Sequence, residues 1–285
     1  MVSLEKLKKM TIQFQKIIWN SRTKSFMLIQ YIIGPAGSGK TTLTKAIMDY
    51  IQNYNSEISI ISLNLDPAVQ KLPYTPDIDI QDYITVNEVV EETGLGPNGA
   101  MIEATDRMVN HIADIKYEID QYNDPEIVLV DTPGQMELFS FRNTGPMIAN
   151  ALGFGEANRN ILFCYDATLC QRPNGFISTV LLAASVQYRF SNLSQINMLT
   201  KKDLLSPERL DMILDWTKDE FSLAMATEQM EKGMLREFSL AINRVFQDFE
   251  VISNMIPVSA KYNEGVDDVW GAIQRASNDD TSPYY

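Results

Sequence analysis

The sequence is poor in the residue types on which several classes of protein depend. It contains 2 cysteines among 285 residues, Cys164 and Cys170, too few for a disulfide framework or a cysteine metal cluster, which favours a reducing compartment. Its only histidine, His111, lies in a helical pattern and is interpreted as a packed or surface residue rather than a catalyst. No apolar run reaches the roughly 18 residues that a membrane span needs. We therefore expect a cytoplasmic protein without a membrane span.

Positive charge is also scarce. The chain has 24 Lys and Arg against 37 Asp and Glu, so its formal net charge is -13, and it is not expected to bind nucleic acid directly. An apolar fraction of 45% and a charged fraction of 21% exclude a disordered chain.

The positive charge that is present gathers at the N-terminus. Residues 1–26 contain six Lys or Arg and one Glu, and their apolar residues fall at near-helical spacing. We expect a basic N-terminal extension, for which three interpretations are open. The first is an arm that docks on a membrane surface or a partner, the second is a targeting segment, and the third is an extension without a part in the chemistry, for which a translation start at Met27 is one explanation. We favour the last.

The rest of the chain alternates short apolar runs with helical patterns. The runs are rich in β-branched residues and apolar on both faces, as in parallel strands buried between helices, and they span residues 28–33, 58–63, 127–130, 161–165, 196–199 and 256–258. Helices are expected over 41–53, 101–121, 176–190 and 207–249. This order predicts an α/β fold with a doubly wound, mostly parallel sheet flanked by helices.

Residues 207–249 have no strand signal, so we expect two or three helices as a cap inserted between the last two strands. In domain terms, we expect one domain over 27–277 with a helical insertion at about 204–250, and a flexible tail over 278–285. The large apolar residues of the insertion are interpreted as ordinary core rather than as a groove for a partner segment; they are Met212, Trp216, Phe221, Met225, Met230 and Met234.

A glycine-rich segment joins the first expected strand to the first expected helix. It fits the pattern G-x-x-x-x-G-K-[ST] of a phosphate-binding loop (P-loop) and reads Gly34-Pro35-Ala36-Gly37-Ser38-Gly39-Lys40-Thr41, followed by Thr42. Glycines let the backbone wrap closely around a phosphate chain, and the N–H groups of a helix start attract its charge. We expect Lys40 to reach the β- and γ-phosphates and the Thr41 hydroxyl to bind Mg²⁺. The segment predicts nucleotide binding.

A second motif, Asp131-Thr132-Pro133-Gly134-Gln135, ends the expected strand 127–130. An acid at the carboxyl end of a parallel strand beside a P-loop is placed to hold Mg²⁺, which is the role we expect for Asp131. The Gly134 N–H is expected to approach the γ-phosphate, and Gln135 and Glu137 to lie within reach of an attacking water. The alternative is a simple turn that ends the strand.

Two further motifs follow later strands. Asp203, in Thr200-Lys201-Lys202-Asp203, can accept two hydrogen bonds from the guanine edge, which adenine does not offer. The stem of Lys201 can lie along the face of the base. Backbone N–H groups of Ser259-Ala260-Lys261 could meet guanine O6. Together they predict guanine specificity, although Asp203 could instead be part of a charged helix start.

In this order the four motifs are those of GTP-binding proteins, and two more segments resemble the GPN-loop GTPase family. These are Gly96-Pro97-Asn98 and Asn64-Leu65-Asp66-Pro67-Ala68, and the resemblance covers residues 28–273. It implies a P-loop NTPase fold and a homodimer whose two nucleotide sites face each other, with Asn98 acting near the γ-phosphate of the partner's site. It also suggests a protein client, RNA polymerase or its assembly intermediates. Thr200 stands where the family has Asn, which implies loss of a side-chain bond to the base and to the P-loop.

We expect a homodimeric GTPase switch that takes GTP and Mg²⁺ and releases GDP and phosphate. Asp66 is a candidate Mg²⁺ ligand or proton acceptor because it ends the strand nearest the P-loop, unless it only forms an Asp-Pro turn. The proposed catalytic set is Lys40, Asp66, Asn98, Gln135 and Glu137. Two alternatives remain open, a nucleotide or small-molecule kinase and a nucleotide-gated binding module with little turnover.

Overall fold

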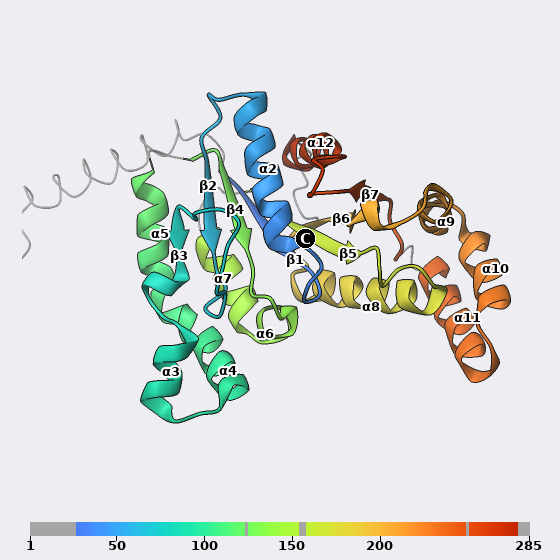
Figure 1. The fold of residues 1–285 in the computed structure, drawn as a ribbon, viewed down its shortest axis with the longest axis horizontal. Coiled ribbons are helices and arrows are strands. Elements are labelled where there is room, and N and C mark those ends of the chain that lie inside the picture. The colour runs from blue at the N-terminus through green and yellow to red at the C-terminus, as the bar shows by residue number, and fades with distance from the viewer. Residues whose placement is uncertain (1–26, 123–124, 154–157, 249–250, 279–285) are drawn as a thin grey trace, which may run out of the picture.

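The computed structural model describes residues 27–122, 125–153, 158–248 and 251–278 (Figure 1). The basic extension expected over 1–26 and nearly all of the tail expected over 278–285 lie outside these ranges.

A seven-stranded parallel sheet forms the centre of the molecule, in the order β3-β2-β4-β1-β5-β6-β7. The strands are β1 (Leu28–Ile33), β2 (Ile60–Asn64), β3 (Ile78–Asp79), β4 (Ile127–Asp131), β5 (Asn158–Asp166), β6 (Ser194–Thr200) and β7 (Met255–Val258). All six expected strands are confirmed, and the doubly wound α/β fold with them. Because β1 lies between β4 and β5, the loop after β1 emerges where the strand order reverses, the place where such sheets bind ligands.

Helices cover both faces of this sheet. They are α2 (Lys40–Tyr54), α3 (Val86–Thr93), α4 (Pro97–Arg107), α5 (Ile112–Gln121), α6 (Met136–Ser140), α7 (Thr144–Leu152), α8 (Pro173–Arg189), α9 (Pro207–Lys218), α10 (Glu220–Met230), α11 (Gly233–Asp248) and α12 (Val266–Asn278). Helices α2 and α12 pack on one face, and α5, α7 and α8 on the other (Figure 1). None of these helices is long and apolar enough to cross a bilayer.

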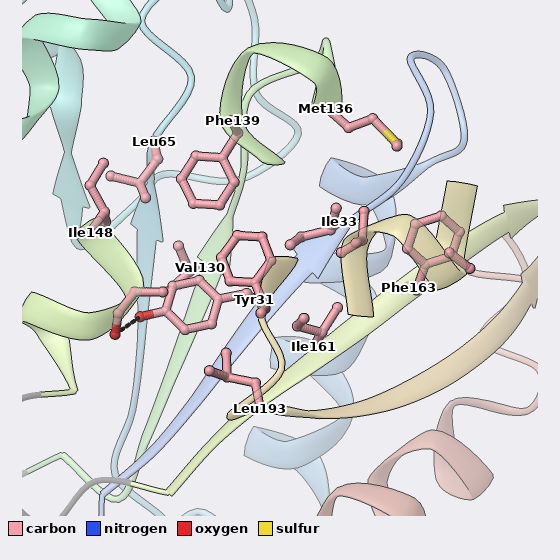
Figure 2. Packing of buried hydrophobic residues seen from close by; sticks show 14 of the residues in the cluster. Tyr31, Ile33, Leu65, Val130, Met136, Phe139, Ile148, Ile161, Phe163 and Leu193 are labelled. Carbon is pink, nitrogen blue, oxygen red and sulfur yellow. Dashed lines mark hydrogen bonds between the residues drawn. The ribbon is translucent and has the colours of Figure 1, made fainter. Parts of the chain in front are cut away.

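The core has one layer on each side of the sheet because side chains of a strand point alternately to opposite faces. In β1, Tyr31 and Ile33 join the larger layer, whereas Ile32 joins the layer under α2 and α12. Figure 2 shows the larger layer, where the buried Tyr31 hydroxyl donates to the carbonyl oxygen of Ala149 at 3.4 Å. Burying each such side chain contributes about 1.5–3 kcal/mol, so β1 and the loop after it rest on a rigid base.

The expected helix over 101–121 is wrong in detail. The structure has α4, a 3₁₀ turn at Met108–His111 and then α5. Helix α4 begins at Pro97, a residue suited to the first helical turn because it has no N–H to leave unpaired. Asn98 therefore lies in the first turn of a helix. We did not expect α3, although Thr85 and Glu88 form the reciprocal capping box that marks a helix start.

Three helices, α9, α10 and α11, lie between β6 and β7, as expected for the cap. The interpretation of its large apolar residues as core is correct for Trp216, which is 3% exposed, but wrong for Phe221, Met225 and Met234, which are 58% to 87% exposed. The reason is that α10 and α11 pack on α8 with one face only, so their opposite faces remain at the surface.

Candidate nucleotide-binding site

The loop between β1 and α2 has the backbone of a phosphate-binding loop. Gly39 has a φ of 93°, in the left-handed region that favours glycine. At Gly34, an added Cβ would lie 2.8 Å from both the Cβ and the carbonyl oxygen of Cys164 on β5. Position 34 is therefore glycine because of close packing, and position 39 is glycine because of its backbone conformation.

Lys40, the first residue of α2, ties this loop to the turn after β4. Its buried ammonium group donates to the carbonyl oxygens of Gly34 at 3.0 Å and Gly134 at 2.9 Å. Burial lowers the pKa of Lys40, while nearby acidic groups, Asp131 and Asp66 among them, act in the opposite direction. The first two motifs of the sequence therefore form one site.

Asp131 ends β4 with one carboxylate oxygen unsatisfied. The Tyr74 hydroxyl donates to Oδ2 at 3.2 Å, whereas Oδ1 is buried and has no hydrogen-bond partner in the part of the chain that the structure describes. Burial raises the pKa of Asp131 to about 6, although Thr41, Lys40 and Tyr74 act to lower it. A buried carboxylate oxygen without a partner suits a cation, bound directly or through water.

This donor set fits Mg²⁺ in the presence of a nucleotide. Within the described ranges, no group of three or more His, Cys, Asp or Glu side chains is placed to hold a metal ion. Mg²⁺ at nucleotide sites needs few protein ligands, because phosphate oxygens and water complete its shell. Thr41 and Asp131 supply the hydroxyl and carboxylate that such a site uses.

Asp66 lies in the same site and uses both of its oxygens. Oδ2 accepts the N–H of Gly134 at 2.8 Å, and Oδ1 accepts the N–H of Ala68 at 2.9 Å. The buried side chain of Asn64 holds the chain here, accepting the Asp66 N–H at 3.0 Å and donating to Asp79 on β3 at 2.8 Å. Asp66 therefore closes the local turn and also reaches the turn after β4.

Tyr74 is a site residue to which we had given no role. It comes from the irregular segment between β2 and β3, which carries no periodic pattern. Its contact with Asp131 joins residues 57 positions apart, so no local spacing could have indicated it.

Thr200 lies at the other side of the P-loop. Its contacts show that the expected loss of a side-chain bond to this loop is wrong. Its buried hydroxyl lies 2.7 Å from the carbonyl oxygen of Ser38 and 3.0 Å from that of Tyr165, in geometry to donate to either. The bond to the P-loop is thus kept without an Asn, because a hydroxyl at the end of β6 reaches the same loop.

The third and fourth motifs meet beside this contact. Asp203 accepts a hydrogen bond from the buried Ser259 hydroxyl at 2.6 Å, which joins the end of β6 to the end of β7. The Lys201 ammonium pairs with Asp166 at 2.7 Å, a partner that no motif had indicated. Ala260 is partly buried, and Lys261 is exposed, its ammonium 4.8 Å from the centre of the Tyr262 ring.

The remaining candidates lie farther out. Gln135 and Glu137 are exposed at the start of α6, and the charge of Glu137 still acts on Lys40. Asn98 is exposed at the start of α4. Figure 1 shows the turn between α3 and α4 at the outer end of this helix pair, well away from the P-loop. The start of α4, the element that carries Asn98, therefore lies apart from the P-loop of the same chain.

Comparisons with known proteins find relatives over most of the chain. A family model described as "Conserved hypothetical ATP binding protein" matches residues 32–279. The chain is 31% identical over 253 residues to a GPN-loop GTPase 2 homolog of Dictyostelium discoideum, covering 87% of this chain and 79% of that protein. It is also 31% identical over 247 residues to a GPN-loop GTPase of Pyrococcus abyssi, covering 85% and 94%.

A solved structure of a GTPase in apo form from Pyrococcus abyssi has the same fold, with a TM-score of 0.77 at 28% identity, covering 88% of this chain and 98% of that one. The parallel sheet of this chain, with the P-loop after β1, is thus a P-loop NTPase fold. On sequence and structure together, this chain belongs to the GPN-loop GTPase family.

Proposed function

We propose that this chain binds GTP with Mg²⁺ and hydrolyses it as a homodimer. The observation that carries the proposal is the gathering of two sets of groups around one P-loop. Lys40 and Asp131 lie at the end that we assign to the phosphates, and Asp203 with Ser259 lies at the end that we assign to the base. Membership of a family whose relatives are named GTPases supports hydrolysis in particular.

Hydrolysis requires that the triphosphate be held while negative charge builds up on it. The Lys40 ammonium now bonds to carbonyl oxygens of the chain, and phosphate oxygens would replace these partners. Thr41 and Asp131 would hold Mg²⁺, which when bound neutralises charge on the phosphates. Thr41 supplies a hydroxyl, and Asp131 supplies a buried carboxylate oxygen that has no partner in the described part of the chain.

The attacking water needs a residue that orients it and one that takes its proton. Gln135 and Glu137, at the start of α6, are our candidates for the first role. Asp66 is our candidate for the second, because its carboxylate touches the turn that carries Gln135. The Gly134 N–H, expected to bind a γ-phosphate oxygen, now donates to Asp66. GTP would compete for this N–H and GDP would not, so the segment after β2 would respond to the γ-phosphate.

In the proposed homodimer, Asn98 acts in the nucleotide site of the second copy. This residue is exposed in the first turn of α4, and Figure 1 shows the α3–α4 turn that leads into this helix away from the P-loop, as expected for a group that acts in the site of a second copy. Its neutral amide can donate a hydrogen bond to the transferring phosphate. We further propose a cytoplasmic location and a protein client, RNA polymerase or its assembly intermediates, on the strength of the family resemblance alone.

Phosphate release tests the proposal directly. The purified chain with GTP and Mg²⁺ should release phosphate steadily without an added acceptor, and Lys40→Ala should abolish this release while leaving the fold intact by circular dichroism. Release that appears only with a small-molecule acceptor would indicate a kinase. Nucleotide binding without release would indicate a binding module.

Asp203→Asn tests the choice of base. The Asn amide would place an N–H donor against the N–H donors of guanine. We therefore expect GDP affinity to fall about 100-fold and xanthosine diphosphate affinity to rise. Equal affinity of the parent for ATP and GTP, or unchanged GDP affinity in the variant, would contradict guanine recognition through Asp203.

A further inference from the structure

Asp166, the last residue of β5, lies beside the proposed base-binding segment. Parallel pairing of β5 with β6 places it opposite Thr200, the residue before Lys201. Its carboxylate is 7% exposed, and Oδ2 accepts a hydrogen bond from the Lys201 ammonium at 2.7 Å. Oδ1 accepts both the N–H of Thr168 at 2.9 Å and its hydroxyl at 2.7 Å. With both oxygens engaged, the carboxylate is held in one orientation.

Lys201 is fixed at both ends. Its backbone has φ 60° and ψ 34°, a left-handed conformation that residues with a side chain adopt rarely. A Cβ built on Gly39 would lie 3.9 Å from Cε of Lys201, so the lysine stem passes over the P-loop. The stem therefore runs from the segment that carries Asp203, across the P-loop, to Asp166 on β5.

We propose that Asp166 is a positioning residue that orders the Lys201 stem as an apolar platform for the guanine ring. This inference rests on the proposed function, since it requires a guanine nucleotide in the site. Lysine is among the residues that lose most rotamer freedom when they are ordered. Asp166 imposes that order before the nucleotide arrives, which is how preorganisation increases affinity.

The ion pair persists at neutral pH. Burial alone would raise the pKa of Asp166, but the hydrogen bonds from Lys201 and Thr168 and the Lys201 charge bring this pKa below its ordinary value. Asp166 touches neither of the residues proposed to hold Mg²⁺. Its loss should therefore weaken binding of the nucleoside part and leave binding of the phosphates unchanged.

Two probes separate these parts, GDP with Mg²⁺ and inorganic tripolyphosphate with Mg²⁺, both measured by calorimetry. We expect Asp166→Ala to bind GDP about threefold to tenfold more weakly and tripolyphosphate as the parent does. Asp215→Ala, which removes an exposed acid on α9, is the charge-matched control and should change neither affinity. In a Lys201→Ala background, adding Asp166→Ala should have no further effect on GDP.

Asp166→Asn covers the case in which the alanine variant does not fold. Its amide oxygen can still accept from Thr168, but the ion pair with Lys201 is lost, so weaker GDP binding is again expected. Unchanged GDP affinity in this variant, an equal loss of tripolyphosphate binding, or additive effects with Lys201→Ala would overturn the inference. A parent chain that binds tripolyphosphate but not GDP would instead remove the proposed function.

Discussion

The Asp66 carboxylate accepts the N–H of Gly134 at 2.8 Å, across 68 positions of the chain. The contact joins the segment after β2 to the turn after β4 and puts a negative charge where a γ-phosphate oxygen is expected. An added Cβ at Gly134 would lie 3.3 Å from the same carboxylate oxygen, so the approach is close and favours glycine. Asp66 therefore competes with the γ-phosphate for the Gly134 N–H, in addition to being our candidate to take the proton of the attacking water.

Asp66→Asn should separate these two roles. The amide oxygen can still accept from Ala68, but the bond from the Gly134 N–H is lost with the charge. Without Mg²⁺, we expect a non-hydrolysable GTP analogue to gain about tenfold in affinity relative to GDP, because a charge-assisted bond no longer competes. With Mg²⁺, turnover of GTP should fall.

Fluorescence titration of labelled nucleotides measures this ratio, and Asp82→Asn, which removes an exposed acid in the 3₁₀ turn after β3, is the control. A ratio that stays at the parent value without Mg²⁺ would show that Asp66 and the γ-phosphate do not share Gly134.

Asn98→Ala should leave GTP binding nearly intact and slow single-turnover hydrolysis on the order of 100-fold, as when one oriented hydrogen-bond donor is removed. A mixture of Asn98→Ala with Lys40→Ala gives a sharper readout. In the mixed dimer one site keeps its own Lys40 and receives Asn98 from the partner, so activity should recover above that of either variant alone. Hydrolysis by Asn98→Ala at the parent rate, or no recovery on mixing, would exclude action in trans.

Thr200→Val should destabilise the nucleotide-free protein by about 1–3 kcal/mol. The substitution keeps the shape of the side chain but leaves the buried carbonyl oxygens of Ser38 and Tyr165 without this donor. Urea unfolding measures the loss, and GDP affinity should fall with it because Ser38 belongs to the P-loop. Thr200→Ser, which keeps the hydroxyl, should lie near the parent in both measurements. Equal stability of the valine and serine variants would contradict this account.

We expect Asp106 on α4 to stabilise the folded protein by an amount that depends on pH in the acid range. It accepts hydrogen bonds from Arg142 at 2.8 Å and Thr144 at 3.0 Å, and the bond from Arg142 is the main reason that the pKa of Asp106 lies below its ordinary value of 3.8. A carboxyl with a lowered pKa binds protons less strongly when folded. Its contribution is therefore complete well above pH 4 and is lost as the pH falls below that value.

Because Asp106 and Arg142 are both partly exposed, solvent screening limits the contribution to about 0.5–1 kcal/mol. Urea unfolding should show Asp106→Asn less stable than the parent by this amount from pH 7 to pH 5, with the difference shrinking at lower pH. A difference that grows as the pH falls would have the wrong sign for this explanation.

The phosphate end of the site could be predicted because its parts are local. The P-loop residues are consecutive, and strand and helix patterns on either side of Gly34 and Lys40 fix their context. The break at Met108–His111 was missed because the apolar spacing continues through it. The start of α4 at Pro97 and the capping box of Thr85 were readable in principle, since both signals lie within four residues.

The partners of these groups could not be predicted in the same way. Tyr74, Asn64 and Asp166 act through contacts with residues that are distant in sequence or on neighbouring strands, and nothing in local spacing says which buried polar groups will meet. The same holds for the hydroxyl of Thr200, whose bond to Ser38 spans 162 positions.

The amino-acid sequence by itself determined the parallel α/β architecture, the P-loop at the end of β1 and the acids that follow later strands, because each depends on periodicity or on neighbouring residues. Only the tertiary structure decided that Asp66 binds the Gly134 N–H and that Lys201 ends at Asp166. Buried N–H groups and charges must find partners wherever the packed strands bring them, and that choice is made by the sheet order rather than by sequence spacing.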